Sequence, residues 1–162
     1  MGLTIRSATI ADLPALWSIL QPVIRAGETY ALRRDMSEAD AISYWCAPSN
    51  ETFVAEQDGA IVGTYILRAN QLGGGSHVAN CGYMTASAAE GRGVARGMLE
   101  HSLARAKERG FRAMQFNFVV SANERAVRTW QRYGFEIVGR LPRAFHHPRA
   151  GDVDALVMFR EL

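Results

Sequence analysis

Apolar side chains recur every three or four residues in several segments of the chain, which is the spacing of a helix with one buried face. These segments lie within residues 9–24, 34–45, 94–109 and 121–133. The second begins near Ser37, a favoured N-cap residue, and in the last Ser121 and Glu124 have the spacing of a capping box. Pro22 should end or kink the first helix, because proline lacks the amide hydrogen that a helix interior needs.

Between these helices, apolar and polar residues alternate or form short apolar runs, which predicts strands. The expected strands lie within residues 3–8, 52–69, 77–86, 111–120, 135–141 and 153–159, of which residues 52–69 form a hairpin around Asp58-Gly59. Residues 142–152, PRAFHHPRAGD, are expected to form an irregular loop. The order is therefore strand, two helices, three strands, helix, strand, helix and two strands, in a single domain covering residues 1–162.

Composition narrows the class of protein. The formal net charge of +2 and the lack of a basic run argue against a nucleic-acid partner. No apolar run approaches the roughly 20 residues that span a bilayer, so no membrane association is expected. Cys46 and Cys81 form no spaced motif, which favours a reduced, cytoplasmic protein without a metal site.

A glycine-rich stretch, AAEGRGVARGML at residues 88–99, precedes the third predicted helix. Such a loop can bind phosphate, because the first-turn N–H groups of a helix are unpaired and glycine lets a ligand approach the backbone. A Walker A loop is excluded, since no Lys-Ser/Thr pair follows the last glycine. A Rossmann fingerprint is excluded because Arg96 stands where the third glycine should be and the loop lies in mid-chain.

Two motifs resemble one family. EGRGVA at residues 90–95 resembles the pyrophosphate loop of the GCN5-related N-acetyltransferases: Gly93 and Ala95 match, and Glu90 stands where Gln or Arg is usual. NERAVRTWQRYGF at residues 123–135 resembles the family's downstream helix through Asn123, Ala126, Gly134 and Phe135. The resemblance implies the acyl-CoA N-acyltransferase fold: an α+β, three-layer domain with a mixed, mostly antiparallel sheet of about seven strands and about four helices. It also implies acetyl-CoA as the cofactor.

The resemblance assigns residues to that cofactor. In this family the strand before the glycine loop separates from its neighbour and pairs with the pantetheine arm, a role that falls on Tyr83, Met84 and Thr85. The pyrophosphate falls to Gly91, Arg92, Gly93, Val94, Ala95 and Arg96. Asn123 is expected to contact the pantetheine arm, with helix capping as the alternative. Trp130 stands where many relatives carry a tyrosine that protonates the departing thiolate. Trp130 is expected to line the cofactor channel.

The general acid and base stay open. Tyr133 lies about one turn after Trp130 and is a candidate acid, with core packing as its alternative. Some relatives carry a glutamate near the position of Asn80, and an asparagine cannot accept a proton there. Candidate bases, with plain solvent exposure as their alternative, lie in the predicted loop: His146, His147, Asp152 and Asp154.

The acceptor is inferred from a further resemblance. The segment from GETY (residues 27–30) onward, together with GDVDA (residues 151–155), resembles the phosphinothricin and L-amino acid N-acetyltransferases. Glu28 is a candidate to hold an ammonium group, and Asn80 to contact the acceptor. Arg33 or Arg34 could hold a carboxylate, although solvated loop charges are the alternative.

The expected activity is thus acetyl transfer to the primary amine of a small molecule, an amino acid or a related amine. Peptide or protein amines are the alternative acceptors. A catalytically weak sensor that binds acyl-CoA is a further alternative, and a nucleic-acid binder is a distant one. Because relatives are often dimers, a homodimer is also expected.

Overall fold

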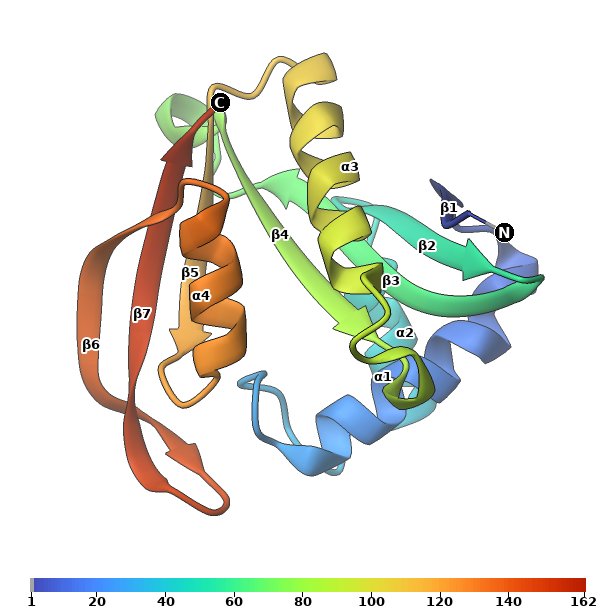
Figure 1. Ribbon diagram of the computed structural model, residues 1–162, viewed down its shortest axis with the longest axis horizontal. Coiled ribbons are helices and arrows are strands. Elements are labelled where there is room, and N and C mark those ends of the chain that lie inside the picture. Colours follow the sequence, from blue (N-terminus) through green and yellow to red (C-terminus); the bar gives the residue numbers. More distant parts are fainter. Residues whose placement is uncertain (1) are drawn as a thin grey trace.

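The sheet has the strand order β1-β2-β3-β4-β5-β7-β6 (Figure 1). The computed structural model describes residues 2–162, and within them the strands are β1 (Thr4–Ser7), β2 (Glu51–Gln57), β3 (Ala60–Ala69), β4 (Val78–Thr85), β5 (Ala113–Val120), β6 (Glu136–His147) and β7 (Gly151–Glu161). The helices in the same residues are α1 (Leu13–Ala26), α2 (Glu38–Trp45), α3 (Val94–Glu108) and α4 (Glu124–Arg132). Neighbouring strands are antiparallel except β4 and β5, which run parallel. The predicted fold class and element order are confirmed.

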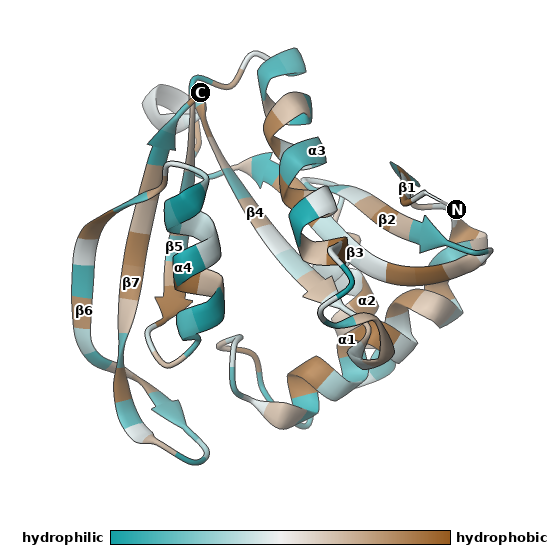
Figure 2. Cartoon of the chain, in the orientation of Figure 1, coloured by the Kyte–Doolittle hydropathy of each residue, from teal (hydrophilic) through white to brown (hydrophobic). Residues whose placement is uncertain are grey.

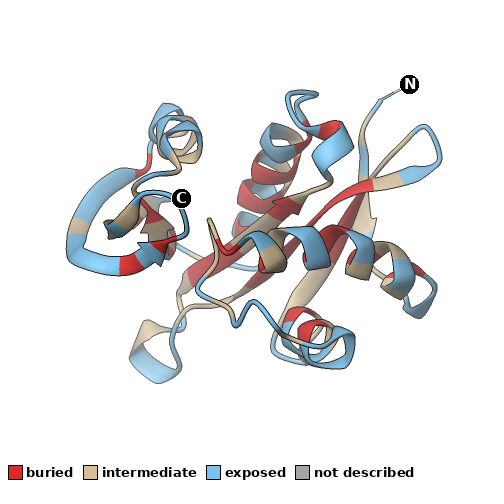
Figure 3. Ribbon diagram, turned by 90° about the horizontal axis from the view of Figure 1, so that it is seen from below, coloured by how far each residue is buried: buried red, intermediate tan, exposed pale blue. Residues whose placement is uncertain are grey.

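Helices cover both faces of this sheet, and each face has its own core. Between the sheet and α1 and α2, buried side chains of both layers pack together, among them Leu16, Leu20 and Trp45 of the helices and Val54 and Met84 of the strands. Between the sheet and α3 and α4, a second core contains Met98 and Leu99 of α3, Tyr65 and Met114 of the strands, and Phe135. Figure 2 shows hydrophobic residues along the strands and on parts of the helices, and Figure 3 shows buried residues in the sheet and on helices packed against it.

Several local predictions are confirmed by the backbone. The Ser37 hydroxyl accepts a hydrogen bond from the Asp40 amide at 3.1 Å, as an N-cap should. Asp58 and Gly59 both have positive φ, 53° and 77°, which is the conformation of a type I′ hairpin turn. None of the helices in residues 2–162 is both long and apolar enough to cross a membrane.

The first helix differs from its prediction, because α1 continues past Pro22 to Ala26. Proline removes the hydrogen bond to the carbonyl four residues earlier, which here belongs to Ser18. Both residues lie on the exposed side of α1, where water can take the place of the missing donor. Pro22 therefore does not end the helix.

Two C-terminal predictions are also wrong. The N-cap of α4 is Asn123 and not Ser121, whose amide instead donates to the Asp154 carbonyl at 2.9 Å. The predicted loop at 142–152 is largely strand, since β6 extends to His147 and β7 starts at Gly151. Pro142 is tolerated because β6 is an edge strand, and the pairing with β7 shifts register between Leu141 and Phe145.

The two parallel strands pair over a very short length. Val78 lies opposite Ala113 and Ala79 opposite Met114, and beyond these pairs β4 and β5 diverge, as Figure 1 shows. The side-chain amide of Asn80 donates to the Gln115 carbonyl at 2.9 Å, immediately beyond the last pair. We call the opening between residues 80–85 of β4 and residues 115–120 of β5 the fork.

Candidate functional site

The glycine loop between β4 and α3 is open to ligands. Gly91 and Gly93 have φ of 77° and 82°, the left-handed conformation that favours glycine. A Cβ built on either residue would meet no atom within 4 Å, so the backbone at these two positions borders open space. Val94, the first residue of α3, is buried and anchors the loop to the core.

This loop presents backbone donors. Gly93 is the N-cap of α3 and has no side chain to cap the helix, so the first-turn amides keep the positive end of the helix exposed. Arg92 and Arg96 face carboxylates, Asp58 at 3.8 Å and Glu100 at 2.9 Å. The arrangement therefore suits a bound anion, which the backbone amides would hold.

The β4 side of the fork carries unpaired backbone groups. The Ala86 amide donates to Val62 of β3, and the Val78 carbonyl accepts from Asn70. Because backbone groups alternate in direction along a strand, the even-numbered residues of β4 face β3, and the odd-numbered ones face the fork. Cys81, Tyr83 and Thr85 thus point N–H and C=O groups toward the fork, and of these the Tyr83 carbonyl accepts a hydrogen bond from the Tyr30 hydroxyl.

Met84 was expected beside Tyr83 and Thr85, and that prediction is wrong for its backbone. It lies opposite Thr64 of β3, and the alternation turns its amide toward that strand. Its side chain is buried in the core under α1 and α2. Met84 therefore packs β4 against the core formed with α1 and α2.

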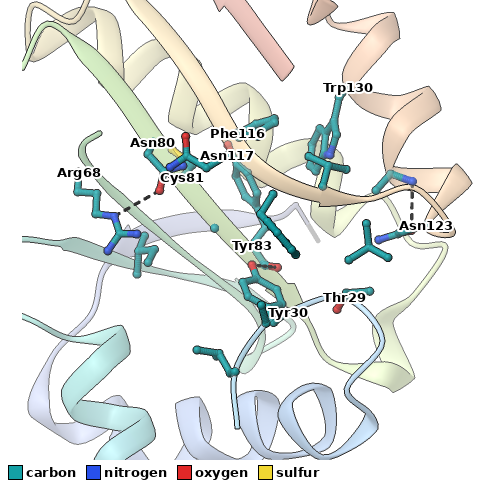
Figure 4. Close-up of a pocket in the computed structure, with 18 of the residues that line it drawn as sticks. Thr29, Tyr30, Arg68, Asn80, Cys81, Tyr83, Phe116, Asn117, Asn123 and Trp130 are labelled. Atoms are coloured by element: carbon teal, nitrogen blue, oxygen red, sulfur yellow. Dashed lines mark hydrogen bonds between the residues drawn. The ribbon is translucent and has the colours of Figure 1, made fainter. Parts of the chain in front are cut away.

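A cavity of about 300 Å³ lies at the fork. Its walls come from the α1–α2 loop, α2, β3, β4, β5 and α4, and Figure 4 shows Arg68 and Trp130 on opposite sides of it. The Trp130 ring lies 5.3 Å from the Tyr83 ring and 5.0 Å from the Phe116 ring, centroid to centroid. Trp130 therefore walls the cavity on the α4 side.

Tyr30 reaches this cavity from the α1–α2 loop. Its hydroxyl donates to the Tyr83 carbonyl at 2.8 Å, across the α1–α2 face of β4 (Figure 4). Burial raises the pKa of Tyr30 well above its ordinary value, so the hydroxyl stays protonated near neutral pH. The contact ties the loop to the strand at the level of the fork.

Asn123 is placed for both roles that the sequence left open, helix capping and contact with a ligand. Its Oδ1 accepts from the Ala126 amide at 3.3 Å and caps α4. The same residue lines the cavity, so its side-chain NH₂ group can donate to a ligand there.

The candidate catalytic residues do not line the cavity, and this holds for His146, His147, Asp152, Asp154 and Tyr133 alike. His146 is exposed and sits opposite Asp152 on β7, with Nδ1 and Oδ1 2.7 Å apart. His147 is buried, and its Nδ1 accepts the amides of Arg149 and Ala150 at 3.2 and 3.1 Å, which closes the β6–β7 turn. These residues were expected in an irregular loop, but the pairing of β6 with β7 places them in a hairpin.

Tyr133 and Glu28 are engaged elsewhere. The Tyr133 hydroxyl donates to Glu100 of α3 at 2.5 Å, on the outer surface between α3 and α4. Glu28 forms an ion pair with Arg149, which joins the α1–α2 loop to the β6–β7 turn. Asn80 does line the cavity. Within residues 2–162, no group of three or more His, Cys, Asp or Glu is placed to hold a metal.

The structure adds lining residues that the sequence did not single out, among them Tyr30, Arg68 and Asn117. Arg68 carried one usable signal, since a charged residue interrupts the apolar run of β3. The sequence could not predict that Asn80 lies opposite Arg68, because the long connection between β3 and β4 does not fix the register of the two strands.

Comparison with known proteins identifies the family. The model of the acetyltransferase (GNAT) family matches residues 14–135, which is most of the chain. The chain belongs to the GNAT family. GNAT proteins are N-acetyltransferases that use acetyl-CoA.

Individual GNAT proteins resemble the chain to different degrees. The structure of a GCN5-related N-acetyltransferase from Kribbella flavida superposes with a TM-score of 0.95 at 42% identity, over 99% of this chain and 98% of that one. N-acetyltransferase aca1 of Schizosaccharomyces pombe is 25% identical over 137 residues, and the match spans 75% of this chain but 66% of that protein. A phosphinothricin acetyltransferase from Sinorhizobium meliloti, solved in complex with AcCoA, has a TM-score of 0.87 at 22% identity, over 100% of this chain and 89% of that one, a likeness of fold.

Proposed function

We propose that this GNAT protein transfers an acetyl group from acetyl-CoA to the primary amine of a small molecule, an amino acid or a related amine. One observation carries the proposal: an open row of backbone groups on β4 runs from the fork to the unpaired first turn of α3. A long ligand with amides at one end and phosphates at the other fits such a row, because strand edges pair with amides and helix N-termini bind anions.

The described residues fit this cofactor. The first-turn amides of α3 would hold the pyrophosphate, and the fork-facing groups of Cys81 and Thr85, with the Tyr83 amide, would pair with the pantetheine arm. The Asn123 NH₂ group would add a donor. When bound, acetyl-CoA supplies the acetyl group as a thioester at the fork.

The cavity contains no protein base. No Asp, Glu or His of residues 2–162 lines it. An amine must be neutral to attack a carbonyl, so the acceptor's proton passes to water and the acceptor reacts as its free base. The backbone N–H groups on the fork side of β4 would stabilise negative charge on the thioester carbonyl oxygen. The C–S bond would then break, coenzyme A would leave as a thiolate, and the remaining proton of the attacking nitrogen would pass to water.

The pH dependence follows from this arrangement. Below the pKa of the acceptor amine, kcat/KM should rise about tenfold per pH unit, because the free-base fraction does. His146→Ala should leave that profile unchanged, since its ring lies on the exposed hairpin. A profile that loses an inflection in His146→Ala or His147→Ala would return the base role to the histidines.

The direct test is thiol release from acetyl-CoA over a panel of amines, with two glycine variants. Gly93→Ala and Gly110→Ala both place a Cβ in open space at a φ of 82° or 81°, so their backbone strain is matched. Only Gly93 lies at the proposed phosphate site. Gly93→Ala should raise the KM for acetyl-CoA several-fold, and Gly110→Ala should not. Equal effects of the two variants would contradict the loop assignment.

The same panel decides between the proposed acceptors. Turnover of peptides but not of small amines would point to protein amines, and tight acetyl-CoA binding without turnover would point to a sensor. We further propose a reduced cytoplasmic protein, in line with the free thiols of Cys46 and Cys81. A homodimer is proposed from the exposed Ile137, Val138 and Leu141 on edge strand β6, and light scattering tests it.

A further inference from the structure

The charge of the cavity is set by a single side chain. Among the residues that line it, Arg68 is the one that carries a full charge, and none is a carboxylate. Several other arginines pair with an Asp or Glu, as Arg105 does with Glu51. Within residues 2–162, Arg68 makes no ion pair with an Asp or Glu. Its positive charge inside a partly enclosed space is therefore uncompensated.

Neighbouring groups hold the Arg68 guanidinium in place. Its Nε donates to Oδ1 of Asn80 at 3.3 Å, across the β3–β4 pair (Figure 4). The NH₂ group of Asn80 in turn donates to the Gln115 carbonyl at 2.9 Å, which fixes which end of the amide faces the arginine. The terminal guanidinium N–H groups remain free to bind a planar anion in two-point fashion.

Nearby amides complete a polar end of the cavity. Asn117 also lines it, and its NH₂ group donates to Asn70 at 2.6 Å. The opposite end is aromatic, with Trp130, Phe116 and the Tyr83 ring. Arg68 is level with Asn80 on β4, and Tyr83 is three residues farther along, which is about 10 Å at the rise of a strand. The cavity thus has a cationic end at a short distance from the fork-facing backbone of Tyr83.

We infer that Arg68, oriented by Asn80, binds a carboxylate of the acceptor and makes the site selective for amines that also carry that carboxylate. The inference rests on the proposed acetyl transfer and names its acceptor class. A zwitterionic amino acid compensates the charge of Arg68. A diamine would place a second cation beside Arg68 with no counter-charge in the cavity, so it should be rejected.

Matched acceptors test this selectivity. Each amino acid is compared with its amide and its decarboxylated amine. The kcat/KM of each acceptor is divided by the fraction of that acceptor present as free base. Because a hydrogen bond to a charged group contributes about 1.5–3 kcal/mol, the wild-type protein should prefer the acid by about 10- to 100-fold in kcat/KM. Arg68→Gln should reduce that ratio to near one while keeping activity toward the amide.

Two further variants separate charge from structure. Arg68→Lys keeps the charge without the planar fork and should retain part of the preference. Arg112→Gln removes an exposed arginine outside the cavity and should leave the ratio unchanged. An unchanged ratio in Arg68→Gln, or a wild-type preference for amides or diamines, would overturn the inference.

A binding measurement distinguishes failure of this inference from failure of the proposed function. Calorimetric titration of the amino acid is done with coenzyme A present, where no turnover can occur. Arg68-dependent binding of amino acids without acetylation in the kinetic assay would refute the transferase function and keep the carboxylate site. Acetylation that depends neither on the acceptor's carboxylate nor on Arg68 would keep the transferase function and refute the carboxylate site.

Discussion

Replacing Tyr30 with phenylalanine tests the contact that joins the α1–α2 loop to the fork. The variant removes only the hydroxyl that donates to the Tyr83 carbonyl at 2.8 Å, and leaves the ring against Trp45. A typical buried hydrogen bond contributes about 1 kcal/mol, and a carbonyl left without a donor costs about 1–3 kcal/mol. The cavity beside this carbonyl can admit water, which favours the lower part of that range.

The expected loss is therefore about 1–2 kcal/mol in the free energy of unfolding, or about 2–8 °C in Tm for a chain of this size. Urea unfolding measures the first and calorimetry the second. Tyr44→Phe is the control, because Tyr44 also lines the cavity but is 36% exposed, and its change should stay within about 0.5 kcal/mol. If the two variants unfold alike, the Tyr30 hydroxyl does not anchor the loop.

Three other outcomes are expected. Trp130→Phe should keep measurable acetyl transfer, because a ring still walls the cavity and a thiolate with a pKa of about 8.5 can leave without a protein acid; complete loss of activity with cofactor binding intact would show that the indole is required. Glu90→Gln should lower the KM for acetyl-CoA by about two- to five-fold at low salt and less at high salt, since it removes a negative charge from the loop proposed to bind the pyrophosphate; an unchanged or higher KM would contradict this. Asp12 is buried and its pKa is held well below the ordinary value by Arg6, so its contribution to stability is present above about pH 4 and is lost as the pH falls; Asp12→Asn should flatten that acid limb of the pH–stability curve.

The parts of the fold that sequence predicts well are those set by local pattern. The turn at Asp58-Gly59 and the cap at Ser37 depend on neighbouring residues alone, and both are found where expected. The motif of Gly93 and Ala95 indicated the family for the same reason, because the loop conformation is encoded within a few residues.

The parts that sequence predicted badly depend on distant partners. His146 and His147 were expected in an irregular loop, and only pairing with β7 makes them part of a strand. Met84 looked like its neighbours until the pairing with β3 decided which backbone groups remain free. Arg68 and Asn80 meet through strand register, which follows from the whole sheet rather than from either segment.

The short β4–β5 junction also bears on how the chain folds. It divides the sheet into two antiparallel sections, β1–β4 and β5–β7, which join through the pairs at Val78 and Ala79 and the Asn80 bridge. Most pairings within each section are between strands close in sequence, and such contacts form early, whereas the junction requires the two sections to dock. The cavity lies along this seam, so it is expected to be completed late in folding and to open first when the protein unfolds locally.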